Sequence, residues 1–367
     1  MKICFVYGSF IGNRPINFND LFKSPRGLTG SELSCICFAK EMLKLGHDVT
    51  LYIEKANADS WNGIKIKQFE KNKWQGLSGY DVVYSWNDPE VLKLVDPKSL
   101  RIVNQQINDF NFVEAGYDNY VDIYTSPSLP HKDHMVRSTG INPNKWVVIP
   151  NGCNPDLYTK GIKVPGRVIY ASSPDRGLHH LLDIWPRIKD AVPEAHLKIF
   201  YDVDTYLKSM LSHTTLVNDP TWMEFYNRAK SISKNLDKLT LLGIEKIGST
   251  SREQMAKEMS EAKVLAYPCD PIMWTEGFSV TTMEACASGT IPVISTADAL
   301  GFIYAKYVPH VFMPLKWQLN DYANLVIKAL RDEVHCPDTA ELAEKHRWSR
   351  LANKLEAILQ FGVKAKQ

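Results

Sequence analysis

Residues 274–295 read WTEGFSVTTMEACASGTIPVIS, and this stretch decides the expected fold. Its middle part follows the period of a helix, which Gly289 ends. The apolar run 291–295 then has the composition of a buried strand. We expect the helix to begin at Glu276, with residues 277–279 in its first turn.

The start of this helix predicts a site for an anion. A helix N-terminus has unpaired N–H groups and the positive end of the helix dipole, so a diphosphate binds there without a metal ion. Glu276 faces the same ligand, and Glu284, about two turns further on, is placed to accept hydrogen bonds from a ribose diol. Taken alone, Glu276 also fits an acid that caps the helix N-terminus, and Glu284 also fits a solvent-exposed helical residue. The expected diphosphate contacts are Gly277, Phe278, Ser279 and Val280.

The whole stretch resembles the E-x7-E signature of retaining GT-B glycosyltransferases, in particular family 4, where it reads roughly E-G-F-G-x-x-x-x-E-A-M-A-x-G-x-P-V. The resemblance implies an α/β protein with two Rossmann-like, doubly wound domains facing a cleft, and a last helix that crosses back onto the first domain. It implies transfer of a hexose from a nucleotide diphosphate sugar to an acceptor, with Glu276 as a catalytic contact to the sugar. No cofactor besides the donor is implied.

A second loop, SSPDRGL at 172–178, follows a strand and opens a helix. It resembles the phosphate-binding loop of the same family, in which a D-R-G element supplies a cation. Arg176 would compensate charge on the leaving diphosphate, because a guanidinium binds phosphate bidentately, and Ser173 is a further expected donor contact. Arg176 as an ordinary surface residue is the alternative. The family often carries a second base five or six positions upstream, where this chain has Ala171 and Tyr170.

The first half of the chain holds weaker candidates. The glycine-rich loop GLTGSE at 27–32 resembles the loop that approaches the sugar phosphate, and Gly30 is the residue expected to allow that approach. A capping box with Thr29 or Ser31 at the helix start is equally compatible. The segment NQQIND at 104–109 lies where many relatives place a histidine. Amides or Asp109 would then orient the sugar hydroxyls.

Two patterns suggest a metal ion, and neither is favoured. Asp202 and Asp204 form a D-x-D, which is the metal signature of the other large glycosyltransferase fold, but the double α/β pattern disagrees with that fold. His179 and His180 have no carboxylate at ligand spacing in the sequence. We therefore expect no metal site.

Strand and helix patterns alternate in both halves of the chain, which predicts two parallel sheets. The expected domains are 1–162 with 346–367, and 163–345. Residues 202–239 read as an insertion in the second domain. A helical stripe in this insertion, more typical of core packing than of a partner surface, comprises Trp222, Phe225, Tyr226 and Ala229.

The composition limits the possible functions. The 367 residues include 43 Lys and Arg against 41 Asp and Glu, a net charge of +2 that does not indicate a nucleic-acid partner. No apolar run approaches the length that spans a bilayer. The seven cysteines are odd in number and lack paired spacing, which favours reduced thiols and a cytoplasmic protein.

Two other functions remain open at this stage. A dinucleotide oxidoreductase would also have Rossmann-like halves, but the first turn reads GSFIG at 8–12 rather than G-x-G-x-x-G. A nucleotide-sugar-binding protein without catalysis fits the missing histidine and the missing second base. The sequence does not indicate the nucleobase or sugar of the donor, the acceptor or the oligomeric state.

Overall fold

The computed structural model describes residues 1–8, 16–25, 27–54, 56–68, 77–110, 113–158, 161–212 and 218–367, with only the backbone at 237–240. They form two compact units. Unit 1 comprises Met1–Ser24, Leu28–Gly152 and His346–Gln367, and unit 2 comprises Pro25–Gly27 and Cys153–Lys345. The long segment of unit 2 starts at Cys153, whereas the sequence placed this boundary at 163. The turn expected at 8–12 lies, apart from Gly8, outside the described residues.

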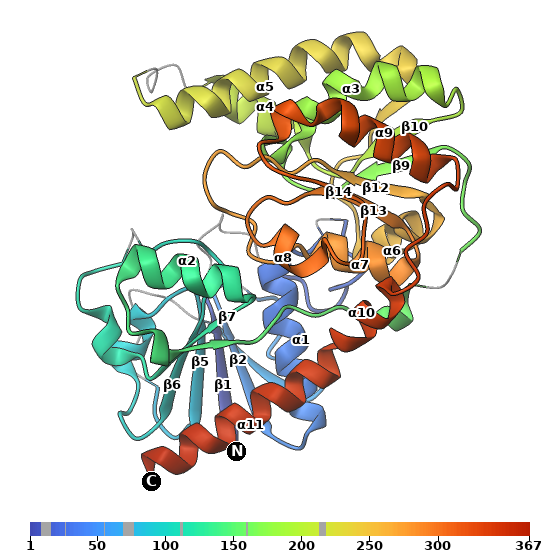
Figure 1. The fold of residues 1–367 in the computed structure, drawn as a ribbon. Helices are drawn as coiled ribbons and strands as arrows, with labels where there is room; N and C mark the ends of the chain where they lie inside the picture. Colours follow the sequence, from blue (N-terminus) through green and yellow to red (C-terminus); the bar gives the residue numbers. More distant parts are fainter. Residues whose placement is uncertain are drawn as a thin grey trace. The chain divides into compact units, whose positions relative to one another are not determined.

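Unit 1 is built on a sheet of eight described strands in the order β3-β4-β2-β1-β5-β6-β7-β8 (Figure 1). Neighbouring strands pair in parallel except β3 with β4. The strands are β1 (Lys2–Tyr7), β2 (Asp48–Ile53), β3 (Ser60–Trp61), β4 (Ile64–Gln68), β5 (Val82–Trp86), β6 (Leu100–Asn104), β7 (Ile123–Ser126) and β8 (Trp146–Val148). Residues 3–6 of β1 are apolar and fully buried, as is typical of a central parallel strand that is covered on both faces.

Three α-helices of unit 1 are described: α1 (Gly30–Lys44), α2 (Leu129–Thr139) and α11 (Trp348–Lys366). α1 begins with a capping box, in which the Glu32 N–H donates to Thr29 Oγ1 at 3.2 Å and the Thr29 N–H donates to Glu32 Oε2 at 2.8 Å. α11 packs on α1 and β6. The last helix is thus part of the first unit, as the resemblance implied.

Unit 2 holds a second sheet of six described strands in the order β11-β10-β9-β12-β13-β14, all paired in parallel. The strands are β9 (Arg167–Tyr170), β10 (His196–Ile199), β11 (Ile244–Lys246), β12 (Val264–Tyr267), β13 (Ile291–Ser295) and β14 (His310–Val311). The helices are α3 (Leu178–Ala191), α4 (Val203–Ser212), α5 (Pro220–Leu239), α6 (Arg252–Glu261), α7 (Val280–Ser288), α8 (Leu300–Tyr304), α9 (Leu319–Leu330) and α10 (Thr339–Lys345). Each unit therefore has the Rossmann-like architecture that the sequence predicted.

The expected insertion at 202–239 contains α4 and α5, which pack on each other, and α5 also packs on α3. Figure 1 shows α5 in yellow along the outer side of α3 and α4. Ala229 is fully buried, whereas Trp222 and Phe225 are half-buried. Within the described part of the chain, no helix has the length and apolar character needed to cross a lipid bilayer.

Candidate functional site

Two loops of unit 2 meet at one edge of its sheet. β9 and β12 are parallel neighbours, with Val168 opposite Val264, so the loops that follow them leave the sheet on the same side. The loops are residues 171–177 and 268–279. Gly177 has a φ of +112°, and a Cβ atom there would lie 1.8 Å from the carbonyl oxygen of Pro268. Only glycine fits at this approach, so the two loops are held in contact.

Arg176 and Glu276 form an ion pair between these loops. Arg176 Nη1 lies 3.0 Å from Glu276 Oε2, and Arg176 Nη2 donates to Thr275 Oγ1 at 3.0 Å. The side chains are 28 % and 9 % exposed. Burial acts to lower the pKa of Arg176, but the Glu276 carboxylate and other neighbouring acidic groups outweigh it and raise this pKa well above its ordinary value. The structure thus brings a permanent cation and a predicted acid together.

Glu276 is also held from two other sides. The Tyr267 hydroxyl donates to Glu276 Oε2 at 2.5 Å, and burial keeps the pKa of Tyr267 well above its ordinary value, so the proton stays on the tyrosine. Asp298 Oδ2 accepts the N–H groups of Thr275 and Glu276, both at 2.8 Å. Tyr267, Thr275 and Asp298 were not predicted from the sequence. The only signal in the sequence was the position of Tyr267 at the end of a strand.

The helix expected to begin at Glu276 begins four residues later, at Val280. Ser279 is its N-cap with a left-handed φ of +66°, and its side chain accepts the N–H of Thr282 at 3.3 Å. Gly277 and Phe278 therefore precede the helix, and Glu276 is not a capping acid. Within the described chain, the N–H groups of Val280 and Thr281 have no hydrogen-bond partner. Of the expected diphosphate contacts, Val280 alone lies within α7, and an anion site at this helix start stays a prediction.

Glu284 is buried on α7, with a side chain that is 3 % exposed. It forms an ion pair with Arg252, the first residue of α6, whose Nη2 also lies 3.4 Å from the Tyr158 hydroxyl. The alternative of a solvated helical residue is therefore wrong for Glu284. Arg252 was not predicted from the sequence, because no local sequence pattern links it to Glu284.

Three further residues were expected to contact the donor: Ser173, Gly30 and Asp109. The Ser173 hydroxyl donates to Asp175 Oδ1 within its own loop. Gly30 is the first residue of α1, directly after the cap Thr29. Asp109 is half-buried in the loop after β6, where its carbonyl oxygen accepts a hydrogen bond from Gln105 Nε2 at 3.2 Å. Gly30 and Asp109 belong to unit 1, and Ser173 belongs to unit 2.

Two histidines of α2 contact the segment 104–109, which has no histidine of its own. His131 on α2 is fully buried; its Nε2 lies 3.1 Å from the carbonyl oxygen of Ile107, and its Nδ1 lies 2.7 Å from Ser126 Oγ. His134 Nε2 lies 3.0 Å from the carbonyl oxygen of Asn108. Burial lowers the pKa of His131 to about 4. His131 is therefore neutral at pH 7 and supports the loop that carries Asp109.

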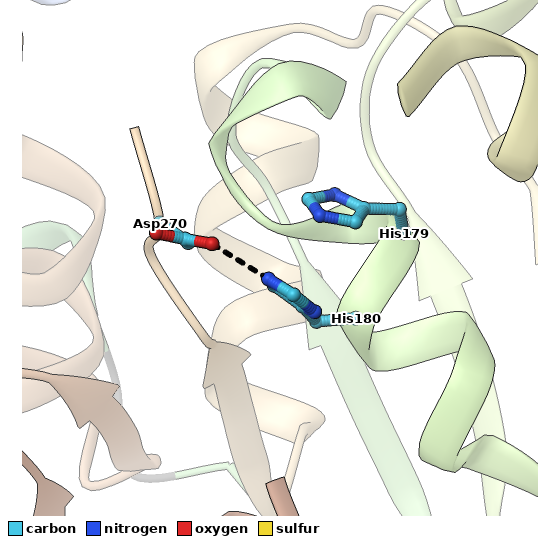
Figure 2. A group of neighbouring side chains, drawn as sticks. All are labelled: His179, His180 and Asp270. Atoms are coloured by element: carbon cyan, nitrogen blue, oxygen red, sulfur yellow. Dashed lines mark hydrogen bonds and ion pairs between the residues drawn. The ribbon is translucent and has the colours of Figure 1, made fainter. Parts of the chain in front are cut away.

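Figure 2 shows a cluster of three side chains, His179, His180 and Asp270. His180 Nε2 lies 2.7 Å from Asp270 Oδ2, and the rings of the two histidines lie 3.9 Å apart. The sequence offers no carboxylate at ligand spacing, and the fold supplies one from a distance: Asp270 reaches the histidines from the loop after β12, 90 residues away. The guanidinium of Arg228 also faces this carboxylate, with Nη2 at 3.7 Å from Asp270 Oδ2.

The D-x-D acids have structural contacts. Asp202 Oδ1 accepts the N–H of Thr205 at 3.1 Å, close to the start of α4. Asp204 is paired with Lys246 at 2.6 Å and is exposed. The two acids are used in helix initiation and a surface ion pair.

Comparison with solved structures supports the fold class. The sucrose-phosphate synthase of Thermosynechococcus elongatus aligns over 99 % of this chain and 100 % of its own, with a TM-score of 0.68 and 13 % identity. HepE of Anabaena, solved with UDP and glucose, aligns over 98 % and 99 % with a TM-score of 0.68 and 14 % identity. AviGT4, a glycosyltransferase of avilamycin A biosynthesis, aligns over 99 % and 98 % with a TM-score of 0.66 and 15 % identity.

At these identities the likeness carries the fold alone, and that fold is the GT-B architecture of two Rossmann-like domains. No protein-family model and no curated protein sequence matches the chain.

Proposed function

We propose that this protein is a retaining, metal-independent glycosyltransferase that moves a hexose from a nucleotide diphosphate sugar to an acceptor. The observation that carries the proposal is the pairing of Arg176 with Glu276 at 3.0 Å, beside the N-terminus of α7. This pairing places a fixed cation, an acid and free helix N–H groups at one sheet edge. That edge is where ligands bind in open parallel sheets.

Each group has a proposed task. Arg176 and the N–H groups of Val280 and Thr281 bind the diphosphate, where the guanidinium and the helix dipole offset its charge. Glu276 accepts hydrogen bonds from hydroxyls of the transferred sugar, and Glu284 accepts them from the ribose. Gly30 and Asp109 of unit 1 stay predictions from the resemblance.

The proposed reaction is a substitution on one face of the sugar. The acceptor hydroxyl oxygen bonds to the anomeric carbon while the bond to the nucleoside diphosphate breaks. A phosphate oxygen of the leaving group takes the hydroxyl proton. Glu276 Oε2 is occupied by Arg176 and Tyr267, which suits a hydrogen-bond acceptor rather than a nucleophile. Stabilising charge on the leaving diphosphate is then the main catalytic contribution.

A thermal-shift screen with UDP, GDP and ADP, each alone and as its sugar conjugates, tests the donor. UDP is the first choice because HepE, which shares the fold, was solved with UDP and glucose. We expect one nucleotide series to raise the melting temperature. A protein that responds to none of them does not use a UDP, GDP or ADP sugar as its donor.

A hydrolysis assay with the stabilising sugar nucleotide separates the enzyme from a binding protein without catalysis. Slow release of the free sugar is expected even without an acceptor, because water replaces the acceptor hydroxyl. Binding without any hydrolysis, and without transfer to a panel of sugars and lipids, would favour the binding protein.

A further inference from the structure

A buried arginine of the insertion reaches the loop that carries Arg176. Arg228 lies on α5 and is 8 % exposed. Its Nη1 donates to the carbonyl oxygen of Asp175 at 2.8 Å and to the carbonyl oxygen of Asp270. Its Nε donates to Glu224 Oε1 at 2.8 Å, one turn earlier on the same helix. One guanidinium therefore joins α5 to both loops of the candidate site.

The two carbonyl groups flank the backbone of Arg176. Asp175 directly precedes Arg176, and the N–H of Asp270 lies 3.4 Å from the carbonyl oxygen of Arg176. His180 in turn holds the Asp270 carboxylate, as Figure 2 shows. The position of the Arg176 backbone is thus set by contacts with α3, α5 and the end of β12.

Only an arginine side chain can make all of these contacts. A guanidinium offers five N–H donors in a fixed plane, whereas a lysine ammonium is a compact point charge with three donors. An apolar side chain of similar length would leave the carbonyl groups of two half-buried residues, Asp175 and Asp270, without this donor. The positive charge beside Asp270 also disfavours a metal ion at the His179, His180 and Asp270 cluster, because two cations would share one carboxylate.

We propose that Arg228 is a positioning residue for Arg176: it fixes the Arg176 loop so that the guanidinium of Arg176 meets the terminal phosphate of a nucleoside diphosphate. The insertion that carries α5 thereby sets the affinity of the site for diphosphates. This inference rests on the proposed function.

Binding of three pairs of nucleotides tests the proposal: UDP with UMP, GDP with GMP, and ADP with AMP, measured by calorimetry on the full chain. In Arg228→Met we expect about a tenfold loss of affinity for the preferred diphosphate and no change for its monophosphate. Arg228→Lys should lose less, because it keeps the charge and some donors. Arg187→Met is the matched control, since Arg187 on α3 is exposed and bonds only Asn320 and Asn324 among the described residues.

A double-mutant cycle gives the second readout. Arg228→Met should cause no further loss of diphosphate affinity in the Arg176→Ala background, because the residue to be positioned is absent. A purely structural role would weaken both nucleotides equally and would do so in either background.

The outcomes separate the inference from the proposed function. Wild-type diphosphate affinity in Arg228→Met, equal losses for both nucleotides, or additive losses in the cycle would each overturn the positioning role. If Arg228→Met does not fold, Arg228→Lys decides: a selective loss for the diphosphate supports the role, and wild-type affinity overturns it. If the wild-type chain binds none of the nucleotides, the proposed function fails and the inference falls with it.

Discussion

The guanidinium of Arg176 lies 3.0 Å from Oε2 of Glu276, although one hundred residues separate the two in the sequence. The contact exists because β9 and β12 are neighbours in the sheet and end at the same edge. Each residue is in turn fixed by its own set of hydrogen bonds. A preorganised ion pair of this kind stabilises charge that appears during a reaction, because it does not have to rearrange.

Arg176→Ala should lower kcat by about two to three powers of ten while changing the KM for the donor much less. The negative charge on the leaving diphosphate grows in the transition state, and the guanidinium binds that state best. Arg176→Lys should recover part of the rate, because a point charge remains. Steady-state kinetics with the donor found by the screen measures both. A wild-type kcat in Arg176→Ala would mean that another base holds the leaving group.

Glu284→Ala should abolish the preference of the protein for a ribose over a 2′-deoxyribose nucleotide. Hydrogen bonds to a charged acceptor contribute about 1.5–3 kcal/mol each, so the wild-type protein should bind UDP at least about tenfold more tightly than 2′-deoxy-UDP. Comparing the two ligands within each variant cancels the loss of stability that follows from removing the carboxylate partner of the half-buried Arg252. An unchanged preference in Glu284→Ala would remove the ribose assignment.

Turnover should survive dialysis against EDTA, because Arg176 and the start of α7 supply the positive charge. Activity assays before and after dialysis, with Mn²⁺ added back, check this. Loss of activity with recovery on Mn²⁺ would contradict it. The cluster of His179, His180 and Asp270 would then be the first place to look, and His179→Ala would test it.

The stability of the protein should fall in mild acid through His131. Burial lowers its folded-state pKa to about 4, from about 6.5 in the unfolded chain, so between these values the unfolded state binds the proton and the folded state does not. The contribution of His131 is complete above pH 6.5 and is lost as the pH falls towards 4. About 2 kcal/mol should be lost between pH 7.5 and 5.

Urea unfolding at the two pH values measures this loss. His131→Gln should show a smaller difference between the two pH values than the wild-type protein, and the exposed His335→Gln should not. Identical differences in all three proteins would show that His131 is protonated in the folded state at pH 5.

Ser279→Ala should destabilise the protein by about 1 kcal/mol, since it removes the cap of α7 and keeps a side chain at a left-handed φ. Ser279→Gly loses the same hydrogen bond but adopts this backbone at no steric cost, so we expect a loss of only a few tenths of a kcal/mol. Urea unfolding of both variants at pH 7.5 compares them. Equal losses would show that the left-handed conformation carries no cost here.

The sequence predicted the strands well because buried parallel strands are short apolar runs bounded by turns. The expected strand 291–295 coincides with β13. The predicted start of α7 was wrong, because the residue at which this helix begins depends on tertiary contacts. Ser279 is held in its left-handed conformation beside Tyr304, whose hydroxyl donates to the carbonyl oxygen of Ser279 at 2.8 Å.

The supports of the candidate site could not be predicted from local pattern. Asp298 reaches the backbone of Glu276 across 22 residues, and Arg228 reaches Asp175 across 53. Such bonds depend on which strands become neighbours, and a single sequence does not encode that in any window of helical or strand length. The motif residues themselves could be found, since Arg176 and Glu276 sit in glycine-containing turns with a recognisable composition.

The packing of α11 has a consequence for the order in which the protein folds during synthesis. The Trp348 ring meets Phe38 of α1 edge to face at 5.2 Å, and Gly362 lies against Leu100 of β6. Unit 1 therefore cannot complete its core until the ribosome has released residues 348–366. Residues 153–345, which make up nearly all of unit 2, emerge earlier. Nascent domains usually fold from the N-terminus onward, but here the first unit needs a helix that follows the whole of the second unit in the sequence.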